Sequence, residues 1–105
     1  MADNYNYKRL PAFNPDDYHS WAHGMESHLQ SKGLYGAIDH QSNGWVGQNH
    51  EEHQQLRYKA YNAILRALSD KYDAIAKRFA NDRPADLWDF LHDEFHSVGF
   101  FLKIF

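Results

Sequence analysis

Two pairs of histidines have the spacing that helical metal sites use. His19 and His23 are four residues apart in the segment YHSWAHGMESHL, and His92 and His96 are four apart in HDEFH. Residues i and i+4 share one face of a helix, so each pair can offer two imidazoles to one metal ion. A zinc site needs further ligands, so the pairs form a site only if their helices pack together. A histidine metal site with hydrolase chemistry is therefore one hypothesis.

The surroundings of these histidines favour a plainer role. HDEFH differs from the zincin pattern His-Glu-x-x-His because Asp93, one methylene shorter than Glu, stands where the general base would be. On a helical wheel, His92 and His96 lie beside Asp89 and Asp93, which is typical of a solvated helix edge. No serine lies in a Gly-x-Ser-x-Gly elbow, and no glycine loop for phosphate is present. We therefore expect no enzymatic activity, no cofactor and no bound metal.

Composition excludes several further classes of function. The chain has 105 residues, enough for one domain, with 16% aromatic residues and a formal charge of −3. That acidic balance leaves RNA binding without support, because phosphate recognition uses clustered Lys and Arg. The absence of cysteine rules out disulfides and thiol chemistry within this sequence. No signal peptide and no membrane-length apolar run is visible, so we expect a cytoplasmic protein without a membrane partner.

Helix signals divide the chain into four segments. Asn14 before Pro15 predicts a helix start, and Gly33 predicts its end just after Lys32, with a hydrophobic contact typical of a Schellman motif. Asn49 resembles a capping box that starts a second helix, ending near residue 68. A break at 69–70 precedes a third helix that extends to residue 79, and NDRPAD precedes a fourth that reaches about residue 98.

The segment between the first two predicted helices has no long helical pattern. LYGAID predicts a short helical turn, and the Gly- and Asn-rich residues 40–50 predict a loop. Trp45 stands alone in that loop, and we expect its ring to tuck back onto the core. Almost no period-two alternation is present. The fold class predicted is therefore all-α, a small bundle of four to five helices.

Three regions follow from this pattern: an irregular segment 1–12, a helical domain 13–97 and an apolar tail 98–105. The tail VGFFLKIF is unfavourable as a free surface and should be buried. It can complete the core as an extension of the fourth helix or a short fifth element, or it can contact a partner or a second copy. The residues predicted for a contact between copies are Phe100, Phe101, Leu102, Ile104 and Phe105.

The apolar landmarks follow an order that resembles a known family. They begin with Phe13 and the Tyr-x-x-Trp of residues 18–21, continue through GLY at 33–35 and ALSD at 67–70, and end with ADLWDFLHDEF. This order is similar to the N-terminal part of Gag polyproteins of Copia-type LTR retrotransposons, over about residues 10–97. The predicted core comprises Phe13, Tyr18, Trp21, Met25, Leu29, Leu34, Ile64, Leu68, Leu87, Trp88, Leu91 and Phe95.

The resemblance implies a capsid-like N-terminal lobe that self-associates into a shell around the element's RNA. The expected partners are other copies, as a dimer or larger, or full-length Gag. A complete Gag continues into a second capsid lobe and often a Cys/His zinc knuckle, and this sequence contains neither. It can be a piece of a longer Gag, a co-opted product whose frame changes after Ser97, or a truncated Gag that interferes with the full-length protein. The alternative hypothesis is a small helical adaptor that binds another protein through an apolar groove or its tail.

Overall fold

The protein is all-helical in a computed structural model that describes residues 10–39, 45–68 and 70–104; for Asp70 and residues 97–104 it describes the backbone alone. The α-helices are α2 (Tyr18–Ser31), α3 (His50–Ala67), α4 (Asp70–Ala76) and α5 (Pro84–Ile104). Two short 3₁₀ helices, η1 (Pro15–Asp17) and η2 (Tyr35–Ala37), stand before and after α2. No strand occurs in these ranges, so the prediction of an all-α fold is confirmed.

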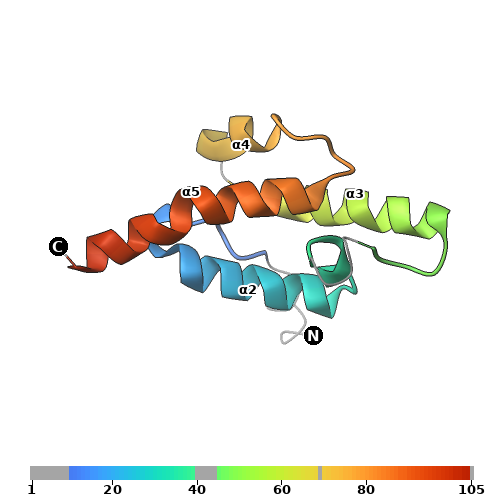
Figure 1. Ribbon diagram of the computed structural model, residues 1–105, viewed down its shortest axis with the longest axis horizontal. Coiled ribbons are helices and arrows are strands. Elements are labelled where there is room, and N and C mark those ends of the chain that lie inside the picture. Colours follow the sequence, from blue (N-terminus) through green and yellow to red (C-terminus); the bar gives the residue numbers. More distant parts are fainter. Residues whose placement is uncertain (1–9, 40–44, 69, 105) are drawn as a thin grey trace, which may run out of the picture.

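Three long helices form the body of the molecule. Helix α5 contacts both α2 and α3, and α2 runs in the opposite direction to the other two (Figure 1). The short α4 lies on the other side of α5 from α2 in that view. The C-terminal turns of α5 continue beyond the start of α2, to one extreme of the molecule.

The first helix begins and ends with the predicted signals, with one difference at its start. The Asn14 side chain accepts a hydrogen bond of 3.1 Å from the Asp16 amide, and it caps the 3₁₀ turn η1 rather than an α-helix. At the other end the Leu34 amide donates to the Leu29 carbonyl at 2.7 Å, and the Gly33 amide donates to Gln30 at 3.1 Å. These two bonds define a Schellman motif, and Gly33 has the φ of 70° that it requires.

Helix α3 begins with an altered capping box. Asn49 Oδ1 accepts a 2.9 Å bond from the Glu52 amide, as expected. The Glu52 carboxylate reaches back to the amide of Gln48 at 3.2 Å, whereas an ordinary capping box would use the amide of Asn49. Gly47, with a φ of 86°, gives the chain the left-handed turn immediately before this pair.

Phe13 joins four parts of the chain at the centre of the aromatic core. Its ring makes edge contacts with Trp21 on α2, Tyr72 on α4 and Phe95 on α5, at centroid distances of 4.8, 5.1 and 5.1 Å. Its amide donates a 2.9 Å hydrogen bond to the carbonyl of Ala67, at the end of α3. Edge-to-face pairs add to the burial of each ring, so this one residue holds the segment before η1 against all four α-helices.

Most of the residues predicted for the core are buried. Trp88 and Phe95 differ, because each packs against the core while part of its ring stays exposed. The remaining predicted residues are buried within the cluster: Phe13, Tyr18, Trp21, Met25, Leu29, Leu34, Ile64, Leu68, Leu87 and Leu91.

The third and fourth helices differ from their expected lengths. Helix α4 ends at Ala76, so Phe79 lies in the following turn rather than on the helix. Helix α5 continues to Ile104 without a break at residue 98 or at Gly99. One glycine costs only about 1 kcal/mol inside a helix, which does not terminate a long one. The tail residues thus belong to α5 as far as Ile104; Phe105 and the predicted break residue Ser69 lie outside the described residues.

None of the helices in the described ranges has the length and apolarity needed to cross a bilayer.

Candidate functional site

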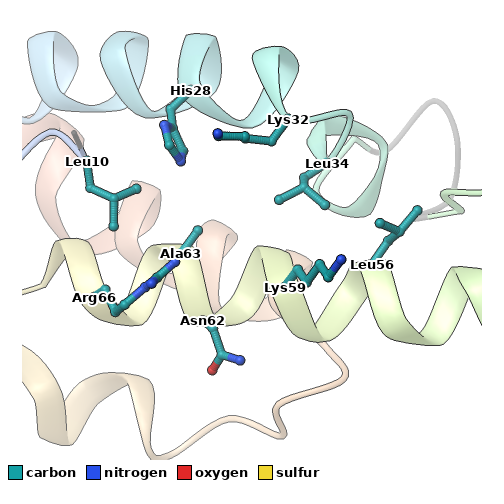
Figure 2. Close-up of a pocket in the computed structure, with 9 residues that line it drawn as sticks. All are labelled: Leu10, His28, Lys32, Leu34, Leu56, Lys59, Asn62, Ala63 and Arg66. Carbon is teal, nitrogen blue, oxygen red and sulfur yellow. The ribbon is translucent and has the colours of Figure 1, made fainter. Parts of the chain in front are cut away.

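A groove of about 710 Å³ lies between α2 and α3 (Figure 2). Helix α2 and the segment after it form one wall, helix α3 forms the other, and the chain before Phe13 closes one end. The lining residues are Leu10, His28, Lys32, Leu34, Leu56, Lys59, Asn62, Ala63 and Arg66. We refer to this feature as the α2–α3 groove.

Helical periodicity explains why these residues share the groove. Leu56, Lys59, Ala63 and Arg66 follow one another at intervals of three or four, which places them along one face of α3. His28 and Lys32 have the same i, i+4 relationship at the end of α2. The Schellman motif turns the chain sharply after α2, and this brings Leu34 under the end of the groove.

The groove combines an apolar floor with cationic edges. Leu34 and Ala63 are buried, Leu10 and Leu56 are half-buried, and all four supply apolar surface. Lys32, Lys59 and Arg66 are exposed, and no Asp or Glu is found among the described residues that line the groove. This local excess of positive charge occurs in a chain whose formal charge is −3. Such a lining suits the binding of a ligand that is both apolar and anionic.

The positive charges of the groove also affect the pKa of His28. Burial lowers the pKa of its imidazole, and the positive charges of Lys32 and Arg66 lower it further. An imidazole is less easily protonated among cations, because the second positive charge is unfavourable there. The side chain of His28 is therefore a neutral part of the wall near pH 7, and it can gain a proton when an anion enters the groove.

The two histidine pairs do not assemble into the four-ligand site of the metal hypothesis. His19 and His96 are adjacent, because His19 Nε2 lies 3.2 Å from the His96 carbonyl oxygen. The rings of His92 and His96 stack at 4.3 Å. His23 is exposed and takes no part in these contacts. Within the described ranges no three His, Asp or Glu side chains have an arrangement that can hold a metal ion.

The imidazoles of His19 and His96 form hydrogen bonds to backbone carbonyl groups. A carbonyl oxygen only accepts, so His19 Nε2 carries the proton that it donates to the His96 carbonyl. His96 Nδ1 likewise donates to the carbonyl of His92 at 2.7 Å. Each bond occupies one nitrogen of its ring, and the first connects the start of α2 to α5. His19 and His96 thus make polar contacts at a helix edge.

Trp45 lies at the surface, contrary to the expectation that it tucks into the core. Its side chain is 46% exposed. The ring stacks on His53 at a centroid distance of 4.0 Å, and its Nε1 donates to the Gly47 carbonyl at 3.1 Å. His53 is the residue that is buried, with Nδ1 3.2 Å from the Val46 carbonyl and Nε2 3.3 Å from an Arg57 nitrogen. The histidine takes the inner position because it pairs with these polar groups, and the indole covers it.

Comparison with known proteins finds no matching family model, no matching curated protein and no matching solved structure. The likeness to Copia-type Gag therefore remains a prediction from the order of the apolar landmarks.

The predicted contact residues and the groove lie at different places in the molecule. The segment that carries Phe100, Phe101, Leu102 and Ile104 forms the last turns of α5, and their side chains are outside what the structure describes. The groove was missed from the sequence, although the basic and apolar residues of α3 at three- and four-residue spacing were a usable signal. That signal does not identify the opposite wall, which comes from residues more than twenty positions earlier.

Proposed function

We propose that this chain is a self-associating helical domain of the capsid-like type found in Copia Gag proteins, and that the C-terminal turns of α5 provide the contact between copies. The observation that carries the proposal is the course of α5. It is one helix of 21 residues, and its end continues past α2 to the edge of the molecule (Figure 1).

The composition of that helix end supports a contact between proteins. Residues 98–104 read VGFFLKI, with one charge among seven residues. Apolar surface contributes about 25 cal/mol for each Å² removed from water, so several Phe, Leu and Ile side chains can stabilise an association strongly. The ends of two such helices, one from each copy, can bury one another through a self-complementary contact, as twofold dimers do. The end of α5 can make the same kind of contact with full-length Gag instead of with a second copy of this chain.

The test is the molar mass in solution, measured by light scattering during size-exclusion chromatography. The full chain is expected to form dimers or larger species. Phe101→Glu places a charge in the helix end and should give a monomer of unchanged helicity. Trp45→Gln removes an exposed aromatic ring elsewhere and should leave the mass unchanged.

A chain that ends at Ser97 provides the second comparison. If it is a folded monomer while the full chain is larger, the end of α5 is an assembly element. If the full chain and both shortened and substituted versions are equally well-folded monomers, the self-association proposal is wrong.

The second candidate function is a helical adaptor that binds another protein. The α2–α3 groove favours it, because an open groove with an apolar floor and cationic edges is a binding surface that self-association through α5 does not use. An adaptor is expected to be monomeric and to retain binding when the end of α5 is changed.

A further inference from the structure

We propose that the α2–α3 groove binds an acidic, amphipathic α-helix of a partner protein. The proposal develops the adaptor function named above and does not rest on self-association. The groove is lined by residues of α2, α3 and their flanking segments, whereas the C-terminal end of α5 continues beyond the start of α2 (Figure 1).

The positive charges of the groove indicate that the partner segment is negatively charged. Lys32 stands on one wall, and Lys59 and Arg66 stand on the other (Figure 2). All three are exposed, and the part of the chain that the structure describes adds no acidic residue to this lining. Acidic side chains on an incoming segment can form charge-assisted hydrogen bonds with these groups. A basic segment would meet the same charge on both walls and would be repelled.

The distribution of those charges determines the shape of the partner. Lys59 and Arg66 are seven residues apart on α3, which corresponds to about 10 Å along the helix axis. Apolar residues alternate with them, since Leu56 and Ala63 lie on the same face. A single carboxylate or phosphate group covers only part of a lining of this length and leaves its apolar residues without a partner. An elongated occupant with acids at intervals and an apolar stripe between them matches both the cations and the apolar residues.

An amphipathic helix supplies this pattern with its own periodicity. Apolar residues at i, i+3 or i+4 and i+7 face the floor, while acids on the two flanks face Lys32 on one side and Arg66 on the other. The groove is bordered by two helices that run in opposite directions, so a third helix can lie along it as in a helical bundle.

The residues that precede Leu10 in the sequence have the wrong charge to be the occupant. Residues 1–9 read MADNYNYKR, with two basic residues against one acid. Their composition does not complement Lys32, Lys59 and Arg66, so we assign the groove to a segment of another polypeptide.

The experiment measures fluorescence anisotropy of the full chain with a stapled helical peptide of about 15 residues, long enough for four turns. The peptide carries Leu on one face and Glu on both flanks. Matched probes are the same peptide with Lys in place of Glu, and a labelled oligouridine. Binding of the Glu peptide alone, weakened by salt, is the expected result, with amide chemical shifts changing at His28, Lys59 and Ala63.

Two double variants separate the groove from the general charge of the protein. Lys59→Gln with Arg66→Gln removes two positive charges from the groove and should weaken peptide binding by about tenfold or more. Lys71→Gln with Lys77→Gln removes two positive charges, one from α4 and one from the turn after it, and should leave the affinity within about twofold of wild type. All four positions are exposed and Gln is a good helix former, so both variants should fold; thermal melts verify this.

Each other outcome overturns the proposal. Absence of binding by the wild-type chain shows that the groove does not take such a helix. Equal weakening by both double variants shows that net charge, not the groove, is responsible. Equal or tighter binding of the Lys peptide or of oligouridine shows that the occupant is a different class of molecule. None of these results changes the molar mass by which self-association is judged.

Discussion

The hydroxyl of Tyr61 on α3 donates a hydrogen bond of 2.8 Å to the carbonyl oxygen of Ala76, the last residue of α4. Both residues are buried, so the bond lies away from water. The same carbonyl also accepts from the amide of Phe79 at 3.0 Å. The end of a helix of seven residues is thus held by a side chain from a helix earlier in the chain. Short helices are marginal in isolation, and tertiary contacts of this kind maintain them.

Tyr61→Phe is expected to destabilise the protein by about 1 kcal/mol, since the carbonyl keeps the Phe79 bond and loses only one partner. Denaturant unfolding measures the change. Tyr58→Phe is the matched control, because the Tyr58 hydroxyl accepts a 2.9 Å hydrogen bond from the exposed Gln54 side chain, and it should cost less than about 0.5 kcal/mol. Equal costs for the two variants would contradict the role assigned to Tyr61.

Trp21→Ala is expected to destabilise the protein by about 3–5 kcal/mol. The indole is 3% exposed, its Nε1 donates to the Pro11 carbonyl at 3.1 Å, and its ring contacts Phe13 and Trp88. His23→Ala, two positions later on the exposed side of α2, should change stability by less than about 0.5 kcal/mol. Thermal melts that gave the reverse order would show that α2 has a different face toward the core.

Replacement by alanine should change the stability in opposite directions at two glycines, Gly24 and Gly36. A Cβ on Gly24, inside α2, would meet Pro11 Cβ at 3.6 Å, an ordinary contact, so Gly24→Ala should stabilise the helix by up to about 1 kcal/mol. A Cβ on Gly36 would lie 2.7 Å from the Trp45 carbonyl oxygen, which forces the backbone to shift. Gly36→Ala should therefore destabilise by about 1–3 kcal/mol. Calorimetry of both variants checks the pair, and a stable Gly36→Ala protein would argue against the close approach of the loop.

The lowered pKa of His28 predicts a loss of stability in mild acid. Burial and the cations Lys32 and Arg66 hold this pKa below its ordinary value of about 6.5, so the unfolded chain binds the proton more readily. Stability rises with pH where the unfolded state holds more protons, and it is lost as the pH falls below about 6.5. Melting temperatures measured from pH 7.5 to 5 should fall less for His28→Gln than for wild type. Parallel curves would contradict the assignment.

The same imidazole should make the groove pH-sensitive as a binding site. An acidic peptide beside His28 favours its protonated form, and by linkage protonation favours the peptide. Affinity for the Glu-flanked peptide should therefore increase from pH 7.5 to 6, where the Glu side chains of the peptide remain ionised. Titrations with His28→Gln should show a flat dependence. A decrease in wild-type affinity on acidification would show that His28 does not face the bound peptide.

Local signals allowed several parts of the fold to be predicted. Asn14, the Gly33–Leu34 ending and the Asn49–Glu52 cap act through bonds between residues at most five apart, so their outcome is contained in short stretches of sequence. The apolar stripe of α2 predicted that Trp21, Met25 and Leu29 face the core, because helical periodicity alone places them together. The exposed position of Trp45 was missed, since it depends on His53 packing beneath the indole and reaching the Val46 carbonyl seven residues earlier, a contact that periodicity within one helix does not predict.

By itself, the amino-acid sequence determined the helical class of this protein, most helix ends and the residues of its apolar stripes, because these depend on bonds and periodicities within a single segment. Only the tertiary structure decided which helix faces remain open. His28 and Lys59 come from different helices, and neither stripe predicts that the gap between them stays unfilled. The groove lies between α2 and α3, and no described helix fills the space that these two walls enclose. The two walls come from residues distant in the chain, so their arrangement depends on tertiary packing rather than on local helix preference.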